Sequence, residues 1–404
     1  MLKPVQIKKD IHWIGAVDYE SRNFHGYSLS PDGTTYNNYV ILDEKKTLVD
    51  TVKADHASAS LERLAQLVRP EDIDWIVVNH VEPDHAGALP LFMEKCRPEA
   101  VFCSPMGEKA LLAHFRDAGD WPLKVVKSGD SISLGKRSLS FLETRMLHWP
   151  DSMFSYMPEE GLLFSNDGFG QNLASSERFA DEVSRELLLH ALSHYYHNIV
   201  LPYSRQVLQV LAKVSELKLD ISMIAPDHGL IFRRREDVEF VLESYRSFAE
   251  QKTQKRAVIV YDTMWHSTER MAYAIAEGLA DAGVPCRIMS LKDNHHSAVM
   301  GEVARCGLVV VGSPTHNNGI LPFVAGFLAF MRGLRPQNRL GAAFGSFGWS
   351  GESVKIIGEQ LSGMGFELPV EGIKTQYVPD EEALEQCCAA GQALGKVLVE
   401  KCAG

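Results

Sequence analysis

Residues 76–87 read IVVNHVEPDHAG, so an apolar run ends in two histidines and two carboxylates within six positions. His80, Glu82, Asp84 and His85 cannot all be packed unpaired in an apolar core, because each such group costs on the order of several kcal/mol when buried alone. β-Branched residues precede the block and Ala-Gly-Ala follows it, which predicts a strand-to-helix turn, where functional residues concentrate. The pattern favours a metal site, and the alternative is an exposed polar loop.

Three later positions repeat this chemistry. His148 and Asp167 each follow an apolar, strand-like run, and His228 lies in the stretch MIAPDHG that begins at Met223. Each one alone is more often an ordinary hydrogen-bonded side chain. Together with the first block they form a series of side chains at strand ends, which is the arrangement that a site for more than one metal ion needs.

The composition is that of a soluble globular protein with more than one domain. The chain has 404 residues, of which 45% are hydrophobic and 23% charged. Its net charge of −11 disfavours binding to nucleic acid and to anionic membrane surfaces. No run approaches the roughly 18 apolar residues of a membrane-spanning helix, and no apolar segment follows the basic N-terminus as in a secretory signal. We therefore expect a cytoplasmic protein that binds neither nucleic acid nor membranes.

The cysteines exclude several kinds of site. There are seven of them, an odd number, and no two have Cys-x-x-Cys spacing. This disfavours a disulfide framework, an iron–sulfur cluster and a zinc site built from thiolates. The cysteines are predicted to be reduced thiols, several of them buried as small apolar residues.

Two domains are predicted from the order of the elements. Residues 1–252 mix short strand-like runs with helical stretches at 57–68 and about 176–197, which indicates an α/β sandwich without regular βαβ alternation. The polar, charged stretch 248–256 marks the domain boundary. From residue 256 to 404 a second domain is predicted.

The second domain alternates regularly between strands and helices, with a fifth strand predicted at 367–370. Such a doubly wound parallel sheet places its ligand site at the carboxyl ends of the strands. The loops 262–268, 312–319 and 345–351 leave those ends, and the first of them brings hydroxyl groups to a helix N-terminus, which suits a phosphate. Neither Gly-x-Gly-x-x-Gly nor Gly-Lys-Ser/Thr occurs there, which disfavours dinucleotide and P-loop sites.

The metal pattern resembles that of the metallo-β-lactamase fold, whose hydrolases carry His-x-His-x-Asp-His followed by His, Asp and His. Glu82 stands at the second histidine of that motif. Because a carboxylate in place of an imidazole makes the site harder and more anionic, Glu82 favours iron over zinc. The full pattern is similar to the flavodiiron protein family, in its rubredoxin–oxygen oxidoreductase branch. The implied fold is an N-terminal metallo-β-lactamase-like αββα sandwich followed by a flavodoxin-like doubly wound sheet of five parallel strands.

The resemblance implies a diiron centre with the following ligands: His80, Glu82 and His148 for one iron, Asp84, His85 and His228 for the other, and Asp167 as the bridge. A water replaces His85 if the loop turns that side chain away. Five further side chains are predicted to wall the pocket or supply protons: His25, Tyr27, Trp149, Tyr195 and Tyr196. Ordinary core packing is the alternative for each of these aromatic residues.

The second half resembles flavodoxin, which implies bound FMN with its phosphate in the first loop and its ring between the other two. The expected FMN-binding residues are Thr263, Met264, Trp265, His266, Ser267, Thr268, Pro314, Thr315, His316, Asn317, Asn318, Gly319, Ser346, Phe347, Gly348, Trp349, Ser350 and Gly351. A doubly wound domain that binds nothing is the alternative.

The implied activity is the reduction of O2 to water with electrons that a separate rubredoxin-type donor delivers through FMN, and the same centre would also suit reduction of NO to N2O. The family further implies a head-to-tail homodimer or a dimer of such dimers. Two other functions stay open. One is a dizinc hydrolase fused to a flavodoxin module, which Glu82 disfavours, and the other is an electron-transfer flavoprotein whose metal is only structural.

Overall fold

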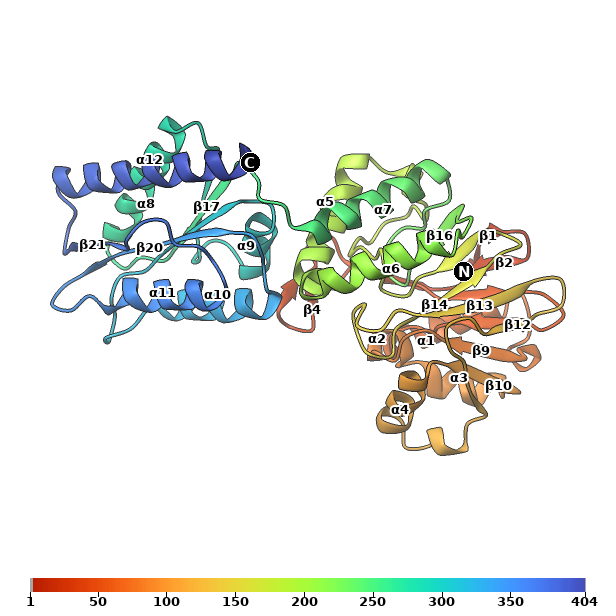
Figure 1. The fold of residues 1–404 in the computed structure, drawn as a ribbon. Helices are drawn as coiled ribbons and strands as arrows, with labels where there is room; N and C mark the ends of the chain where they lie inside the picture. Colours follow the sequence, from red (N-terminus) through yellow and green to blue (C-terminus); the bar gives the residue numbers. More distant parts are fainter. Residues whose placement is uncertain (1–2, 404) are drawn as a thin grey trace. The chain divides into compact units, whose positions relative to one another are not determined.

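The structure is a computed structural model that describes residues 3–403. It divides into two compact units, each with its own core, and Figure 1 colours them along the sequence. The first unit contains the chain up to Gly26 together with Ser30–Tyr196 and Tyr203–Ala249. The second contains Tyr27–Leu29, His197–Pro202 and the chain from Glu250 onward.

The first unit is built on two β-sheets that share one core. The seven-stranded sheet has the order β1 (Val5–Lys8), β2 (Ile11–Trp13), β7 (Tyr39–Ile41), β8 (Thr47–Val49), β9 (Trp75–Val78), β10 (Ala100–Cys103) and β11 (Leu123–Val125). The five-stranded sheet has the order β12 (Ser131–Ser133), β13 (Ser138–Glu143), β14 (Met153–Met157), β15 (Leu162–Phe164) and β16 (Met223–Ala225). Side chains from both sheets, such as Val77 and Phe164, pack in one cluster.

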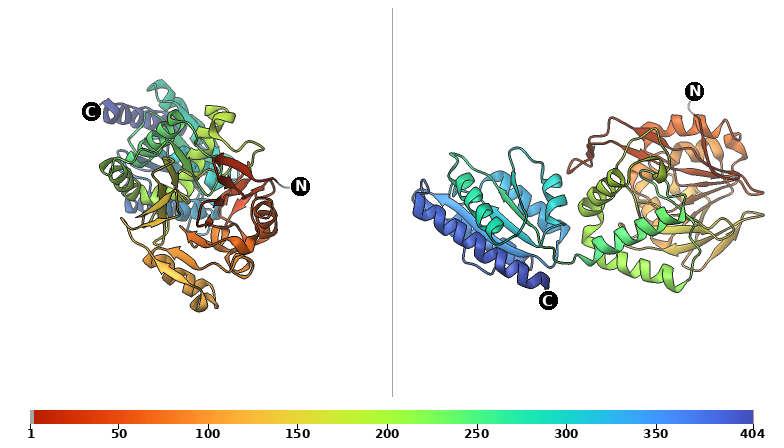
Figure 2. Two further views of the ribbon diagram at one scale, coloured as in Figure 1. Left: turned by 90° about the vertical axis from the view of Figure 1, so that its right-hand side faces the viewer. Right: turned by 90° about the horizontal axis from the view of Figure 1, so that it is seen from above.

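Alternation along β9 explains why helices cover the outer face of the first sheet. Val77 faces the core between the sheets, whereas Ile76 and Val78 face a second cluster. That cluster is filled from α1 (Ala57–Leu64), α3 (Leu89–Cys96) and α4 (Pro105–His114). The other outer layer contains α5 (Arg185–Tyr195), α6 (Ser204–Glu216) and α7 (Arg235–Glu250), as Figure 2 shows. The predicted αββα sandwich is therefore confirmed.

The second unit has one five-stranded sheet in which every pairing is parallel. Its order is β18 (Cys286–Ser290), β17 (Ala257–Tyr261), β19 (Leu308–Gly312), β20 (Leu340–Phe347) and β21 (Ile373–Gln376). Apolar side chains of α8 (Ser267–Asp281) and α12 (Glu381–Ala403) pack on the sheet in one cluster. The remaining helices are α9 (His296–Val303), α10 (Pro322–Leu334) and α11 (Glu352–Gly363). The strand order reverses between β17 and β19, as in the predicted doubly wound fold.

Two predicted elements are misplaced. The helix expected from about 176 begins at Arg185, because the Ser184 side chain accepts a hydrogen bond from the Leu187 amide at 3.2 Å and caps the helix there. The fifth strand lies at Ile373–Gln376 and not at 367–370. Pro369 lacks the N–H that a strand in a sheet interior donates, so the apolar stretch around it cannot continue a ladder.

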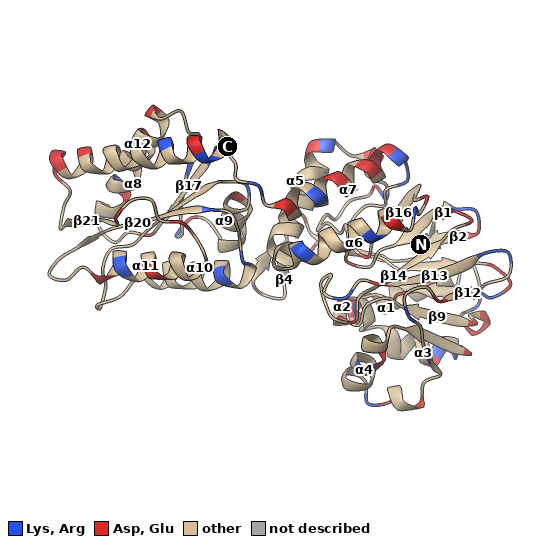
Figure 3. Cartoon of the chain, viewed as in Figure 1, with Lys and Arg blue, Asp and Glu red and all other residues tan. Residues whose placement is uncertain are grey.

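Charges of both signs are interspersed on the surface helices. Figure 3 shows this along α7, and the guanidinium of Arg234, the residue before the helix, donates to the Asp237 carboxylate in its first turn at 2.9 Å. Within residues 3–403, no helix combines the length and the apolar run that crossing a bilayer requires.

Candidate metal centre and cofactor pocket

The loop that carries the first predicted ligands is tied to both sheets of the sandwich. Asp50, at the end of β8, accepts hydrogen bonds from the backbone and side-chain N–H groups of Asn79 at 2.6 and 2.7 Å. Asn79 accepts one from the Ser155 hydroxyl at 2.6 Å, and its carbonyl accepts one from the Met153 amide at 3.0 Å. The loop after Asn79 therefore leaves the sheet in a fixed direction.

A short helix, α2 (Pro83–Ala86), follows at once and turns two more side chains inward. Proline suits its first position, because the fixed φ matches the helix and the missing N–H would have no helical partner there. Asp84 and His85 project from this turn, and His85 is fully buried. The exposed polar loop considered as an alternative is therefore wrong for this stretch.

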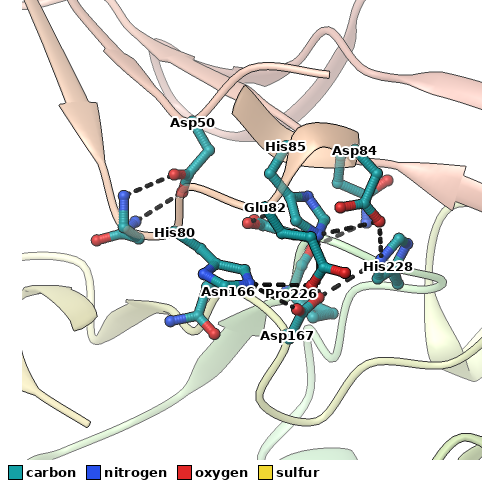
Figure 4. Close-up of polar contacts among 12 residues, drawn as sticks. Asp50, His80, Glu82, Asp84, His85, Asn166, Asp167, Pro226 and His228 are labelled. Carbon is teal, nitrogen blue, oxygen red and sulfur yellow. Dashed lines mark hydrogen bonds and ion pairs between the residues drawn. The ribbon is translucent and has the colours of Figure 1, made fainter. Parts of the chain in front are cut away.

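The structure brings all seven predicted ligands together. They form two groups: His80, Glu82, His148 and Asp167 in one, and Asp84, His85 and His228 in the other. Within each group, one potential ligand atom per residue lies within 4.8 Å of every other. Figure 4 shows the labelled members of both groups pointing toward a common space.

Asp167 connects the two groups. Its Oδ2 lies 3.0 Å from His148 Nε2, and its Oδ1 lies 3.1 Å from His85 Nε2. One carboxylate thus offers an oxygen to each group, as a bridging ligand would.

Buried polar atoms without hydrogen-bond partners show that this cluster is suited to bind cations. Among residues 3–403, both carboxylate oxygens of Asp84 and the Nε2 of His228 are buried and have no hydrogen-bond partner. Asp84 Oδ2 and His228 Nε2 lie 3.2 Å apart as an ion-pair contact, but they form no hydrogen bond. Leaving such atoms unpaired costs about 1–3 kcal/mol each. A bound metal ion satisfies all three.

Two histidines are oriented through the ring nitrogen that faces away from the cluster. His80 Nδ1 lies 3.0 Å from Asp151 Oδ2, and His228 Nδ1 donates to the Thr35 carbonyl at 2.6 Å. A hydrogen bond at Nδ1 selects the tautomer whose Nε2 lone pair is available to a metal. Asp151 and Thr35 were not predicted as site residues, because only the folded chain brings them to these rings.

Charges within the cluster shift its pKa values strongly. Burial alone would lower the pKa of His148, but hydrogen bonds with Asp167 and Glu82 raise it to about 9. Burial alone would raise the pKa of Asp167, but His85, His148 and His80 hold it well below its ordinary value. The Asp167 carboxylate is therefore anionic at neutral pH, and a metal ion that binds here would displace the proton of His148.

Two of the five predicted pocket residues lie against the cluster. The Trp149 ring stands edge-on to His80 with centroids 5.3 Å apart, and the Tyr195 ring lies 5.8 Å from that of His228. Tyr195 is fully buried, and its hydroxyl has no hydrogen-bond partner within the described part of the chain. Burial, followed by the charge of Asp167, raises the pKa of Tyr195 well above its ordinary value.

The other three have different surroundings. His25 is exposed, and its ring packs 4.1 Å from Phe24, which in turn stands edge-on to His228 at 5.8 Å. The Tyr196 hydroxyl lies 3.1 Å from that of Ser204, and its ring packs on a neighbouring tyrosine. The Tyr27 side chain is 66% exposed.

A pocket of about 330 Å³ opens at the carboxyl ends of the strands of the second unit. The three predicted loops line it through Thr263, Met264, Trp265, Ser267, Pro314, Thr315, His316, Asn317, Asn318, Ser346, Phe347, Gly348, Trp349 and Ser350. His266, Thr268, Gly319 and Gly351 belong to the same loops but are not in the lining. Thr268 instead ties two loops together, since its hydroxyl lies 3.1 Å from that of Ser346.

The rim of this pocket presents large aromatic surfaces to solvent. Trp265, Trp349 and Tyr377 are 86%, 89% and 62% exposed. A flat ring bound between such faces removes apolar area from water, so the rim suits an isoalloxazine. Tyr377 follows β21 directly and was missed, because the fifth strand was placed too early in the sequence.

The hydrogen bonds of Asp50 predict a stability effect. We expect Asp50→Ala to lower the free energy of unfolding by about 2–4 kcal/mol, because it leaves two buried donors of Asn79 unpaired and opens a small cavity. Ser155→Ala, which removes one hydroxyl from the same network, should cost about 1 kcal/mol. Denaturant unfolding of both variants measures this, and equal small losses would show that the Asp50–Asn79 contacts do not hold the loop.

Comparisons with known proteins agree with the fold predicted for each of the two domains. The family model described as "ODP family beta lactamase" matches residues 34–229, and the flavodoxin model matches residues 259–391. The chain is 49% identical over 402 residues to a rubredoxin-oxygen oxidoreductase of Megalodesulfovibrio gigas, covering 100% of both chains. It is 44% identical over 396 residues to a nitric oxide reductase of Moorella thermoacetica, covering 98% of both.

The fold agrees as well. A solved structure of rubredoxin oxygen:oxidoreductase from Desulfovibrio gigas superposes with a TM-score of 0.98 at 49% identity, covering 100% of each chain. Its fold matches the one described above. The chain therefore belongs to the flavodiiron protein family and is an oxidoreductase of the rubredoxin–oxygen oxidoreductase type.

Proposed function

We propose that this protein reduces O2 to water at a diiron centre, with electrons that a rubredoxin-type donor delivers through FMN. The observation that carries the proposal is the pair of buried metal-binding groups joined by Asp167. The same chain offers a pocket with an aromatic rim at the cofactor position of a flavodoxin fold. The relative named rubredoxin-oxygen oxidoreductase supports both the donor and the substrate.

The residues that hold the metal are those of the two groups. His80, Glu82 and His148 would hold one iron, Asp84, His85 and His228 would hold the other, and Asp167, which contacts both groups, would serve both. Three of the seven ligands are carboxylates, which favours iron over zinc, because the zinc sites of the related hydrolases consist mainly of imidazoles. When bound, the iron pair supplies the one-electron redox chemistry that the side chains lack.

FMN is held by the three loops of the second unit. The N-terminus of α8 at Ser267 and the hydroxyl of Thr263 would hold the phosphate, because unpaired helix N–H groups and the helix dipole favour an anion. Trp349 and Tyr377, which line the pocket, would contact the ring system. The proposed diiron domain comprises residues 1–252, and the proposed FMN domain comprises residues 256–404.

Tyr195 contributes a proton donor to the diiron pocket. Its pKa is raised, so the hydroxyl stays protonated at neutral pH. The hydroxyl is buried and has no partner among the described residues, so it can donate a hydrogen bond to an oxygen of the substrate. Trp149 excludes water from the His80 side of the same pocket.

Reduction of NO to N2O is the second candidate function. The relative named nitric oxide reductase supports it at 44% identity over nearly the whole chain. The ligand set suits either diatomic molecule, so the two activities share one centre. We further propose that the protein acts in the cytoplasm as a head-to-tail homodimer or a dimer of such dimers.

One experiment tests the function directly. Protein prepared without oxygen is assayed for iron, zinc and FMN, and its steady-state rates with O2 and with NO are compared under the same reduced rubredoxin. We expect about two irons and one FMN per chain and a higher rate with O2. Active protein that contains two zincs and no iron would instead identify a hydrolase, and a higher rate with NO would make NO the substrate.

A further inference from the structure

A buried carboxylate behind His85 takes no part in either metal-binding group. Asp227 is fully buried, and its Oδ2 lies 3.6 Å from His85 Nδ1. In the part of the chain that the structure describes, His85 Nδ1 and both Asp227 carboxylate oxygens have no hydrogen-bond partner. Three polar atoms without partners are thus buried opposite one another.

We propose that Asp227 is the positioning residue of His85, and this rests on the proposed metal centre. The Asp227 carboxylate accepts a hydrogen bond from His85 Nδ1–H. A neutral imidazole has one N–H and one lone pair, so this contact leaves the lone pair on Nε2. Nε2 is the atom that faces the cluster, 3.1 Å from Asp167 Oδ1. His85 is thereby held as a ligand of the group that contains Asp84.

Neither end of this contact is free to move away. The His85 carbonyl accepts hydrogen bonds from the amide and the hydroxyl of Thr51. The Asp227 amide donates to the Asn166 carbonyl at 2.8 Å, and the Asp227 carbonyl accepts from the Asn37 amide at 2.7 Å. These backbone hydrogen bonds keep the two side chains opposite one another, with His85 Nδ1 3.6 Å from Asp227 Oδ2.

The surroundings leave no better donor for Asp227 among the described residues. The nearby hydroxyl of Tyr39 already donates to the Pro226 carbonyl at 2.7 Å. The arrangement also matches that of the other oriented ligands, since His80 contacts Asp151 and His228 contacts a carbonyl through Nδ1. Partners of this kind typically contribute about 10–100-fold to metal affinity.

The test compares iron affinity in Asp227→Ala, His85→Ala and the double variant. Each full-length protein is loaded with ferrous iron and titrated with a competing chelator, and X-ray absorption counts imidazole ligands. We expect Asp227→Ala to weaken the more labile iron about 10–100-fold and to lower the imidazole count as His85→Ala does. The double variant should lose little more than either single one, because both changes remove the same interaction.

Controls distinguish an effect of Asp227 on iron binding from misfolding and from a failure of the proposed function. Asp227→Asn keeps the size of the side chain and a weaker acceptor, so it should show an intermediate loss with unchanged circular dichroism. Wild-type affinity and imidazole count in Asp227→Ala, or additive losses in the double variant, would overturn the role of Asp227. If the wild type contained no iron, the proposed function would be rejected but the role of Asp227 would not, because the affinities of the same variants can be measured with zinc.

Discussion

Glu82→Ala is expected to abolish O2 consumption while FMN stays bound. The Glu82 carboxylate lies 3.2 Å from His148 Nε2 and 3.3 Å from His80 Nε2. The group contains one other carboxylate, Asp167, which also contacts the second group, so the loss of Glu82 leaves the first group without a carboxylate of its own. We expect the rate with reduced rubredoxin to fall at least about 100-fold, which corresponds to about 2.7 kcal/mol. An oxygen electrode measures the rate, and elemental analysis measures the accompanying loss of iron.

Two further variants interpret that result. Glu94→Ala changes an exposed carboxylate of the same unit, paired only with Lys95 among its described contacts, and should leave both rate and iron unchanged. Glu82→His restores the hydrolase pattern and should shift metal preference toward zinc. Full O2 consumption in Glu82→Ala would instead mean that the metal is structural and that the protein is an electron-transfer flavoprotein.

Ser267→Asp is expected to weaken FMN binding about 100-fold or more. Ser267 is the first residue of α8 and lines the pocket. A carboxylate there occupies the helix N-terminus and repels the FMN phosphate, which otherwise gains from the helix dipole and the unpaired N–H groups. Titration of FMN-depleted protein, followed by the quenching of FMN fluorescence, gives the dissociation constant.

Matched substitutions show whether position or charge is responsible. Ser267→Ala removes one hydroxyl and should cost about tenfold, consistent with the loss of a single hydrogen bond. Ser362→Asp places the same carboxylate at an exposed site in the last turn of α11 and should leave FMN affinity unchanged. Wild-type affinity in Ser267→Asp would show that the phosphate binds elsewhere.

The elements that the sequence predicted well are those with strong local patterns. The central strands β17 and β19 of the second unit are apolar runs rich in β-branched residues, and all five strands are parallel, as their alternation with helices required. The fifth strand was misplaced because β21 has a half-exposed, polar sequence, whereas the apolar residues before it surround Pro369. Tyr377 was missed for the same reason.

The sequence by itself determined which side chains have metal-binding chemistry, because a histidine or carboxylate at the end of an apolar strand can be recognised from its neighbours. Glu82 also favoured iron over zinc before any geometry was known. Only the tertiary structure decided how these side chains are held. Asp50, Asp151, Thr35 and Asp227 contact Asn79 or the ligands across long stretches of sequence, and no local pattern encodes a contact that exists only after both sheets have packed.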